Sequence, residues 1–328
     1  MHLLAGDIGG THTRLIYAEI HNHVQHVLAE KSYPSADYND LQSVLDIFLT
    51  EHVISNTIDA ACFAVAGPVK GNVASITNLP WVISQQALCE TLQTPRIKLI
   101  NDFVAAAYGI SVLDESDIQI LQQGNNTSQN QDAAIIGAGT GLGASHLVWS
   151  NNHYQIYPSE AGHAGFSPEN ELQCELLSWM LKQHDYVSLE MLLSGRGLIK
   201  IYQFLNEVKD IAESLSVNAA MKQSDPASVI SDYALTGRDE LCQKTLDCFI
   251  DIYGSAASNI ALHYYPIGEV YIAGGIAPKI KNKLLGSRFI EAFRNKGLMS
   301  SNMEQITIKL ICQEKTGLYG ALSHAQSL

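Results

Sequence analysis

Two segments of this chain share one pattern, in which an apolar strand leads into a turn rich in glycine and threonine and then into a second, alternating strand. The first covers residues 3–20 and the second residues 133–149, followed by a further strand at 154–157. Alternation on both sides of a turn predicts antiparallel strand pairs. Two copies of one unit, about 130 residues apart, predict an internally duplicated α/β architecture.

The second turn reads GAGTGLG over residues 137–143, and its glycines let a backbone approach a phosphate closely. The Walker A pattern needs a lysine, and none follows these glycines. A relaxed dinucleotide-binding pattern, Gly139-x-Gly141-x-x-Ala144, must open a helix, whereas the residues that follow alternate like a hairpin. We therefore predict a hairpin whose turn binds nucleotide phosphates. Two ordinary glycine-rich β-turns are the alternative.

Length and charge limit the classes of protein that need to be considered. A chain of 328 residues favours two domains. The formal net charge of −13 makes nucleic acid and anionic membranes poor partners. Six scattered cysteines without a CxxC pair predict reduced thiols rather than a disulfide framework or a zinc site. The first residues read as a strand, not as a signal peptide, so we expect a cytoplasmic protein.

The remaining elements follow from periodicity and from helix-start signals. Asn101 and Asp102 end an apolar strand and open a helix, a position that suits both residue types. A polar run at 122–131 predicts a loop near the domain boundary. The expected strands are 59–65, 96–100 and 269–273, and the expected helices are 40–52, 172–183, 189–205, 227–234, 238–264 and one around 317–321.

Nearly end to end, the sequence resembles the bacterial-type glucokinase family. The matching pieces are DIGGTHTR, AGPVKGNVASITNLPW, LINDFVAAAYGI, GAGTGLG, PSEAGHAGF, LEMLLSGRGLI and VYIAGGIAPKI. DxGGT alone occurs in many sugar kinases, and the ordered set is far more specific. The resemblance implies the actin-like ATPase/hexokinase fold, with two ribonuclease H-like α/β domains flanking a cleft. We expect a small domain of residues 1–112 plus about 301–328, and a large domain of residues 113–300.

The resemblance also implies ATP-dependent phosphorylation of glucose at its 6-hydroxyl, with Asp102 as the general base. A ring of vicinal hydroxyls needs carboxylates and amides as partners, because unmatched buried polar groups are costly. The sugar site implied in this way consists of Asn101, Asp102, Glu160, His163 and Glu190, with Thr77 and Asn78 as weaker candidates.

For the nucleotide, the resemblance implies ATP with Mg²⁺, an ion that keeps most of its hydration shell. Asp7 would hold it through water, and Arg14 would contact a phosphate or the other domain. Two turns would bind the phosphates, and a glycine pair would lie against the adenosine. These residues are Gly9, Gly10, Thr11, Gly139, Thr140, Gly141, Gly274 and Gly275.

Three positions depart from the family's usual residues, namely His12, Ala161 and Arg196. None removes a proposed catalytic group, and we expect them to bear on sugar affinity or hinge geometry and thus on fine specificity. The alternatives are a kinase for another hexose or an N-acetylhexosamine, and a non-catalytic sugar sensor. A sensor of this superfamily would carry a DNA-binding segment, which we do not expect here. An NAD-dependent oxidoreductase is remote, because it would need a helix after residue 143. The resemblance implies a homodimer.

Overall fold

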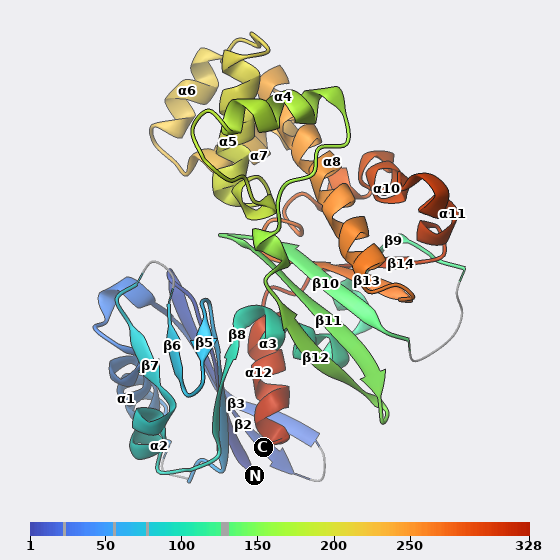
Figure 1. The fold of residues 1–328 in the computed structure, drawn as a ribbon. Helices are drawn as coiled ribbons and strands as arrows, with labels where there is room; N and C mark the ends of the chain where they lie inside the picture. Colours follow the sequence, from blue (N-terminus) through green and yellow to red (C-terminus); the bar gives the residue numbers. More distant parts are fainter. Residues whose placement is uncertain (22–23, 55–56, 77–78, 126–130) are drawn as a thin grey trace. The chain divides into compact units, whose positions relative to one another are not determined.

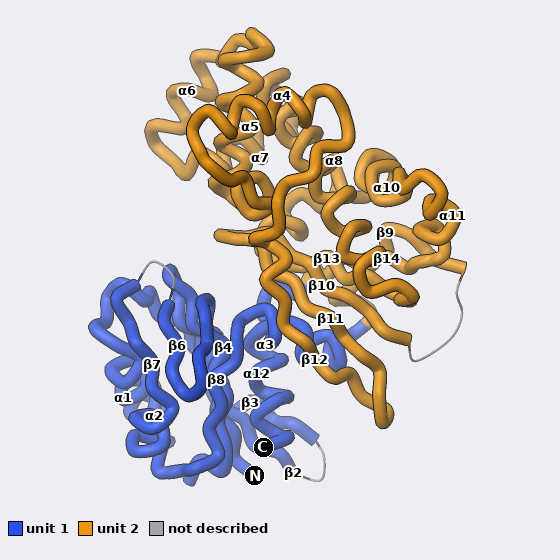
Figure 2. The backbone as a smooth tube through the Cα atoms, viewed as in Figure 1, with its two compact units in different colours: residues 1–114, 313–328 blue, residues 115–312 orange. Residues whose placement is uncertain are grey.

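A computed structural model describes residues 1–21, 24–54, 57–76, 79–125 and 131–328 (Figure 1). Thr77 and Asn78, the weaker sugar-site candidates, lie outside the described residues, as do residues 126–130 of the loop expected at 122–131. The chain divides into two units, residues 1–114 with 313–328 and residues 115–312 (Figure 2). Each unit is described by itself below.

Unit 1 is built on a five-stranded sheet in the order β3-β2-β1-β4-β8. The first three strands are antiparallel neighbours, whereas β1, β4 and β8 run parallel. The glycine turn joins β1 to β2, which confirms the predicted hairpin. The strands are β1 (His2–Ile8), β2 (His12–His21), β3 (Val24–Pro34), β4 (Ala60–Val65) and β8 (Ile97–Asn101).

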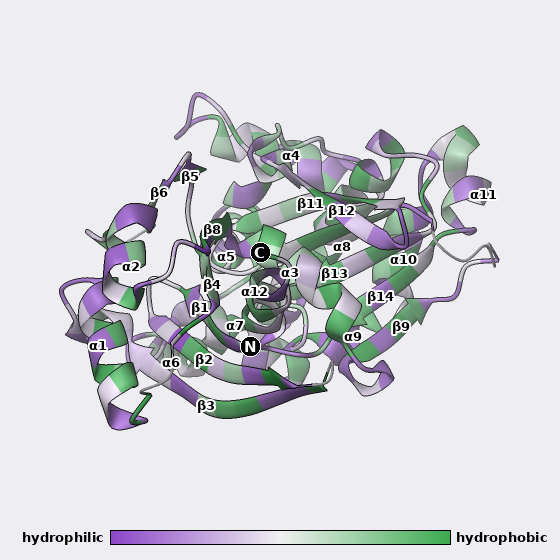
Figure 3. Cartoon of the chain, turned by 90° about the horizontal axis from the view of Figure 1, so that it is seen from below, coloured by the Kyte–Doolittle hydropathy of each residue, from purple (hydrophilic) through white to green (hydrophobic). Residues whose placement is uncertain are grey.

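The two faces of this sheet are buried by different sets of helices. Alternate residues of β1 point to opposite faces, so Leu4 and Ile8 join one core cluster while Leu3 and Ala5 join the other. The first cluster includes residues of α1 (Leu41–Glu51) and α2 (Gln85–Leu92), and hydrophobic and hydrophilic residues alternate along α1 (Figure 3). The second includes α3 (Asp102–Gly109) and α12 (Thr316–Gln326), which lie side by side (Figure 1).

Short elements complete unit 1. Asp40 begins α1, since its carboxylate accepts a hydrogen bond from the Ser43 amide at 2.8 Å. A second, three-stranded sheet in the order β5-β6-β7 was not predicted from the sequence. These elements are β5 (Val69–Lys70), β6 (Val73–Ser75), β7 (Val82–Ser84) and the 3₁₀ helices η1 (Ser35–Asp37) and η2 (Ile110–Val112).

Unit 2 repeats the strand order of unit 1 and adds one strand, giving β12-β11-β10-β13-β14-β9. Strands β12, β11 and β10 are antiparallel neighbours, and β10, β13 and β14 run parallel. This repetition confirms the internal duplication expected from the two glycine-containing segments. The strands are β9 (Ile118–Gln122), β10 (Ala133–Ala138), β11 (Leu142–Ser150), β12 (His153–Ser159), β13 (Glu269–Ala273) and β14 (Thr307–Ile311).

The longest helix of unit 2 is α8 (Glu240–His263), most of whose residues are buried, and the helices at residues 195–207, 226–235 and 287–294 pack against it. The helix predicted over 189–205 is wrong in its first part, because Ser194 interrupts it and caps a new helix by accepting a hydrogen bond from the Gly197 amide at 3.1 Å. The elements are η3 (Glu115–Asp117), η4 (Ala161–His163), α4 (Glu171–Met180), η5 (Leu189–Met191), α5 (Gly195–Glu207), α6 (Leu215–Met221), α7 (Pro226–Leu235), α8 (Glu240–His263), α9 (Lys281–Leu284), α10 (Ser287–Arg294), η6 (Gly297–Met299) and α11 (Ser300–Met303).

The chain returns from unit 2 to unit 1 close to its carboxyl terminus. Strand β14 pairs in parallel with β13, so residues 301–312, which we expected in the small domain, belong to unit 2. Helix α12 then packs on β1 and β4 of unit 1. Among the described residues, no helix is both long enough and apolar enough to cross a membrane.

Candidate active site

Asp102 lies where strand β8 becomes helix α3, at the carboxyl edge of the unit 1 sheet. Asn101 caps the helix: its Oδ1 accepts a hydrogen bond from the Phe103 amide at 2.9 Å, and its Nδ2 donates to the Gly67 carbonyl at 3.3 Å. Asp102 Oδ1 accepts from the same Phe103 amide at 3.0 Å. The Asp102 carboxylate is therefore held at a helix N-terminus, where a negative charge is favoured.

The carboxylate of Asp7 lies at the same edge of the sheet. Strands β1, β4 and β8 are parallel; Asp7 pairs with Ala64 of β4, and Ala64 pairs with Ile100 of β8, close to Asp102 in the chain. Burial, followed by the charge of Asp7, raises the pKa of Asp102 from its usual 3.8 to about 6. Burial also raises the pKa of Asp7, and the nearby charge of Arg14 opposes that increase.

Arg14 faces Asp7 across the β1–β2 ladder, and its Nη1 lies 3.7 Å from Asp7 Oδ2. In unit 1 this arginine thus supplies a positive charge beside Asp7, the carboxylate that raises the pKa of Asp102. The structure of this unit gives Arg14 a local role, in addition to the phosphate or interdomain contact predicted from the sequence.

The first glycine turn is closed by the Gly9 amide, which donates to the His12 carbonyl at 2.9 Å. Ser35 braces it from η1, since its amide donates to the Thr11 carbonyl at 2.9 Å and its hydroxyl to the Gly9 carbonyl at 2.8 Å. Within the described residues, the amides of Gly10 and Thr11 donate to no other protein group. Such free amides in a turn suit an anion.

The second glycine turn has the same form. The Gly139 amide donates to the Gly141 carbonyl at 2.8 Å, and the Gly195 amide donates to the Gly139 carbonyl at 3.0 Å. In the part of the chain that the structure describes, the amides of Thr140 and Gly141 make no protein hydrogen bond. Leu142, the next residue, donates its amide to Glu190 Oε2 at 3.0 Å.

The glycine pair after β13 is joined to the second turn through the end of β10. Gly274 has a φ of +82°, and the Ile276 amide donates to the Ala138 carbonyl at 3.2 Å. The buried hydroxyl of Tyr253 accepts from the Ala138 amide and donates to the Ala273 carbonyl, both at 3.2 Å. One tyrosine on α8 therefore ties together the two strand ends that carry the predicted nucleotide residues.

Glu160 and His163 stand at the two ends of η4, and their side chains are 89% and 65% exposed, with His163 Nε2 3.9 Å from Glu160 Oε2. Helix η4 packs directly on β11, because a Cβ at Gly162 would lie 2.1 Å from the Leu142 carbonyl oxygen. Both side chains are thus available to a ligand while their backbone is fixed against the second turn.

The structure groups the predicted residues within each unit. Unit 1 brings together Asp7, the first turn, Asn101 and Asp102. Unit 2 brings together Glu160, His163, Glu190, the second turn and the glycine pair 274–275. Sequence reasoning missed the roles of Ser35, Gly195 and Tyr253, which hold the turns and strand ends by hydrogen bonds. Ser35 and Tyr253 lie outside the motifs and are fully buried, whereas Gly195 lies within the matching piece LEMLLSGRGLI.

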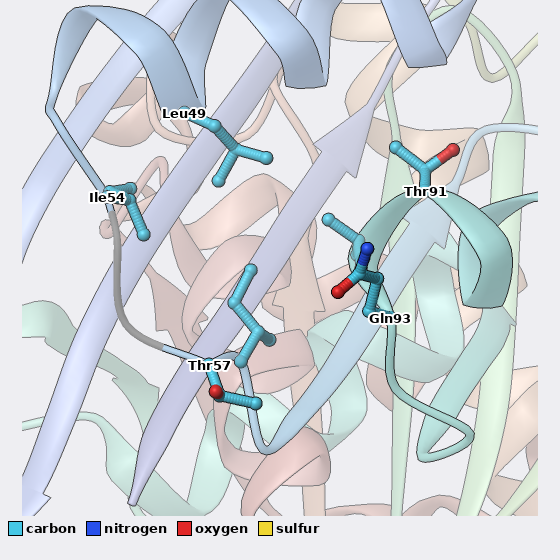
Figure 4. Close-up of a pocket in the computed structure, with 7 residues that line it drawn as sticks. Leu49, Ile54, Thr57, Thr91 and Gln93 are labelled. Carbon is cyan, nitrogen blue, oxygen red and sulfur yellow. The ribbon is translucent and has the colours of Figure 1, made fainter.

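A cavity of about 230 Å³ in unit 1 lies away from these residues (Figure 4). Residues at the ends of α1 and α2 and residues that precede β4 line it, so the cavity lies near the amino ends of the parallel strands. Asp102 lies at the carboxyl ends of these strands. The cavity is therefore not part of the candidate site. Its lining residues are Leu49, Ile54, Thr57, Ile58, Thr91, Leu92 and Gln93.

The donor set around Asp7 suits a magnesium ion. Mg²⁺ prefers oxygen ligands and usually keeps several waters. The Asp7 side chain is 26% exposed, and its carboxylate lies close enough to Asp102 for its charge to raise the pKa of that residue. The described residues contain no group of three His, Cys, Asp or Glu side chains that could enclose a metal. Asp7 therefore fits an ion whose remaining ligands are water and phosphate.

Two α/β units with one strand order, each with a glycine turn between its first two long antiparallel strands, define the class of the protein. It has the fold of the actin and hexokinase superfamily, in the branch of two-domain sugar kinases. Within that class the family follows from direct comparison. Residues 4–328 match the family model described as Glucokinase, and the chain belongs to the glucokinase family.

Individual relatives agree with this assignment. The chain is 43% identical to a glucokinase of Trichormus variabilis, with 97% of each chain covered. A crystal structure of a glucokinase from an Antarctic psychrotroph is similar with a TM-score of 0.84 and 33% identity, covering 100% of this chain and 99% of that one. A ROK family glucokinase from Streptomyces griseus, solved with glucose and AMPPNP, has a TM-score of 0.65 at 17% identity, covering 100% of both chains, and thus shares the fold. The family, the fold class and the enzyme class predicted from the sequence are confirmed.

Proposed function

We propose that this chain transfers the γ-phosphoryl group of ATP to the 6-hydroxyl of glucose, with Asp102 as the general base. The observation that carries the residue assignment is the carboxylate of Asp102, fixed at the N-terminus of α3 with its pKa raised to about 6. A base with such a pKa is ionised at neutral pH and still has useful proton affinity. The fold shared with a glucokinase solved with glucose and AMPPNP supports the choice of substrates.

Asp102 accepts the proton of the 6-hydroxyl as its oxygen forms a bond to the γ-phosphorus. The bond from that phosphorus to the bridging oxygen breaks, and ADP leaves. Phosphoryl transfer depends mainly on positioning and charge stabilisation. In this proposal the amides of both glycine turns bind the triphosphate, and the glycine pair 274–275 lies against the adenosine. A magnesium ion held by Asp7 through water would neutralise charge on the phosphates.

The sugar hydroxyls are bound in this proposal by carboxylate, amide and imidazole groups. Unit 1 contributes Asn101 and Asp102, and unit 2 contributes Glu160, His163 and Glu190. The capping bonds of Asn101 fix its side chain, and the packing of η4 on β11 fixes the backbone that carries Glu160 and His163. From the resemblance alone, we propose that the enzyme is a cytoplasmic homodimer.

Activity should fall in acid because Asp102 must be ionised to accept a proton. Its pKa is raised to about 6, so the protonated and inactive form accumulates below that pH. We expect kcat/KM for glucose to be constant above about pH 7 and to fall about tenfold per pH unit well below 6. A pH series with saturating MgATP measures this. A profile that stays flat to pH 4.5 contradicts the assignment of the base.

A panel of hexoses with MgATP, followed by coupled detection of ADP, tests the substrate. We expect glucose to be turned over with a kcat/KM about 10- to 100-fold above that for mannose or N-acetylglucosamine, since a mismatched hydroxyl leaves a buried partner unsatisfied at a cost of about 1–3 kcal/mol. Preference for another sugar would favour the alternative hexose or hexosamine kinase. Binding of glucose without turnover of any hexose would favour the sugar sensor.

A further inference from the structure

Glu190 contacts the phosphate-binding turn as well as belonging to the predicted sugar site. We propose that Glu190 is a positioning residue for the nucleotide, whose carboxylate braces the β10–β11 turn, so that the sugar and the phosphates bind to one connected structure in unit 2. The sugar half of this inference rests on the proposed function. The brace itself rests on contacts that are present without any ligand.

The first contact is a charged hydrogen bond. Glu190 Oε2 accepts from the Leu142 amide at 3.0 Å, immediately after the turn residues Thr140 and Gly141. A bond to a carboxylate is stronger than one between neutral groups. It fixes the start of β11, where the two strands of the hairpin separate into the turn. The orientation of the free turn amides therefore depends on the position of this carboxylate.

The second contact is steric. A Cβ at Gly141 would lie 2.5 Å from Glu190 Oε2, so a side chain at residue 141 would force the carboxylate away from its present position. Because residue 141 is a glycine, the carboxylate can lie against the turn and accept the hydrogen bond from the Leu142 amide.

The segment that carries Glu190 also contacts the residue at the start of the turn, Gly139. The Gly195 amide donates to the Gly139 carbonyl at 3.0 Å, so η5 and the start of α5 hold both sides of the turn. The close approach of Gly162 to the Leu142 carbonyl adds η4, which carries Glu160 and His163. Every residue of unit 2 predicted to bind sugar thus stands on a segment packed against the phosphate turn.

The carboxylate can serve both ligands because it has two oxygens. Oε2 is engaged by the turn, and Oε1 can accept a hydrogen bond from a sugar hydroxyl. Sugar bound at Oε1 would restrict the Glu190 side chain and, through Oε2, the turn. Binding energy from the sugar would therefore help to organise the phosphate site, which is a positive coupling between the two ligands.

Hydrogen exchange at the Leu142 amide tests the brace without substrate. We expect Glu190→Ala to speed this exchange about tenfold, in line with the loss of a hydrogen bond to a charged group. Glu190→Gln should stay close to the wild-type rate, because the amide oxygen can still accept. Exchange of the Leu142 amide that is unchanged in Glu190→Ala overturns the proposal. Because no turnover is measured, this result is independent of whether the enzyme phosphorylates glucose.

Nucleotide binding in the absence of sugar provides the functional readout. We expect calorimetry to show that Glu190→Ala weakens the binding of AMPPNP about tenfold, because the hydrogen bond to the Leu142 amide is lost. Glu160→Ala is the matched control, since it also removes a carboxylate, but one whose side chain is 89% exposed. We expect Glu160→Ala to leave the affinity for AMPPNP unchanged. Both variants should raise the KM for glucose. Equal AMPPNP affinity in the two variants would show that Glu190 serves the sugar alone.

A double-mutant cycle tests the steric link. Gly141→Ala should displace the Glu190 carboxylate and thereby raise the KM for glucose, although residue 141 belongs to the phosphate turn. In Gly141→Ala/Glu190→Ala the clash is absent, so the combined effect on the KM for glucose should be smaller than the product of the single effects. Multiplicative effects would mean that the two residues act independently and would overturn the link.

Discussion

Replacing Asp102 with asparagine should lower kcat about 100-fold or more, as the loss of a general base does. The change removes the proton acceptor and little else, because an asparagine Oδ1 can still accept the hydrogen bond that the Phe103 amide donates to Asp102 Oδ1. Steady-state kinetics with saturating glucose and MgATP measure the effect. Turnover within a few-fold of the wild type would remove Asp102 from the mechanism.

A matched substitution separates this effect from a general perturbation of helix starts. Asp40 also begins a helix of unit 1 and accepts a hydrogen bond from the amide of Ser43, but it belongs to no predicted site. Asp40→Asn should therefore leave kcat within about twofold of the wild type, since capping by asparagine and aspartate is similar.

The same Asp102 variant should be more stable than the wild type at alkaline pH. A carboxyl whose pKa is raised on folding destabilises the folded state as the pH rises from the usual value of 3.8 to the folded pKa, here about 6, and the loss of stability is complete above that range. Because one pKa unit corresponds to about 1.4 kcal/mol, Asp102→Asn should raise the free energy of unfolding by up to about 3 kcal/mol at pH 8. The difference should vanish below about pH 4. Greater stability with lower activity would show that Asp102 is retained for chemistry rather than for folding.

Replacing Gly320 with alanine should destabilise unit 1 by about 2–3 kcal/mol, the upper part of the range for overpacking. Gly320 lies on α12 where that helix meets α3, and a Cβ there would lie 1.8 Å from the Ala105 carbonyl oxygen and 2.5 Å from the Gly109 amide nitrogen. Backbone atoms of a helix cannot move aside as the end of a flexible side chain can. Helices α3 and α12 must therefore separate, and Asp102 lies at the start of α3.

Gly317→Ala is the control, one turn earlier on the same helix. Its Cβ would lie 3.9 Å from the Asp102 carbonyl oxygen, an ordinary contact, and alanine favours a helix over glycine by about 1 kcal/mol. Thermal or urea unfolding should therefore show opposite changes for the two variants. Equal stability of Gly320→Ala and Gly317→Ala would show that the close approach of α3 and α12 does not constrain unit 1.

Local patterns predicted the elements that carry the candidate site. The alternation around the two glycine turns predicted hairpins rather than a strand and helix, and the ladders β1–β2 and β10–β11 confirm it. Asn101 and Asp102 were predicted at a helix start because their side chains can cap free amides, and they are found there. Each of these features depends on neighbours within a few residues, which is why one sequence could reveal it.

Some elements were missed or misjudged. Strands β9 and β14 were not predicted, although apolar and polar residues alternate over residues 305–310, and their ladder partners identify them. The helix expected over 189–205 is interrupted at Ser194, which caps a new helix that begins at Gly195. The start of this helix is held by the hydrogen bond from the Gly195 amide to the carbonyl of Gly139, in a hairpin more than 50 residues away. Long-range hydrogen bonds outweigh helical periodicity at that point.

By itself, the sequence determined the family, the duplicated hairpins and the identity of the polar groups available for chemistry, because these follow from residue type and spacing. Only the tertiary structure decided how those groups act on one another. It showed that burial and then the charge of Asp7 raise the pKa of Asp102, that burial raises the pKa of Asp7 while Arg14 opposes the increase, and that Glu190 contacts the phosphate turn. Charge interactions and close packing depend on distances across the fold, and residues far apart in the chain acquire those distances only when it folds.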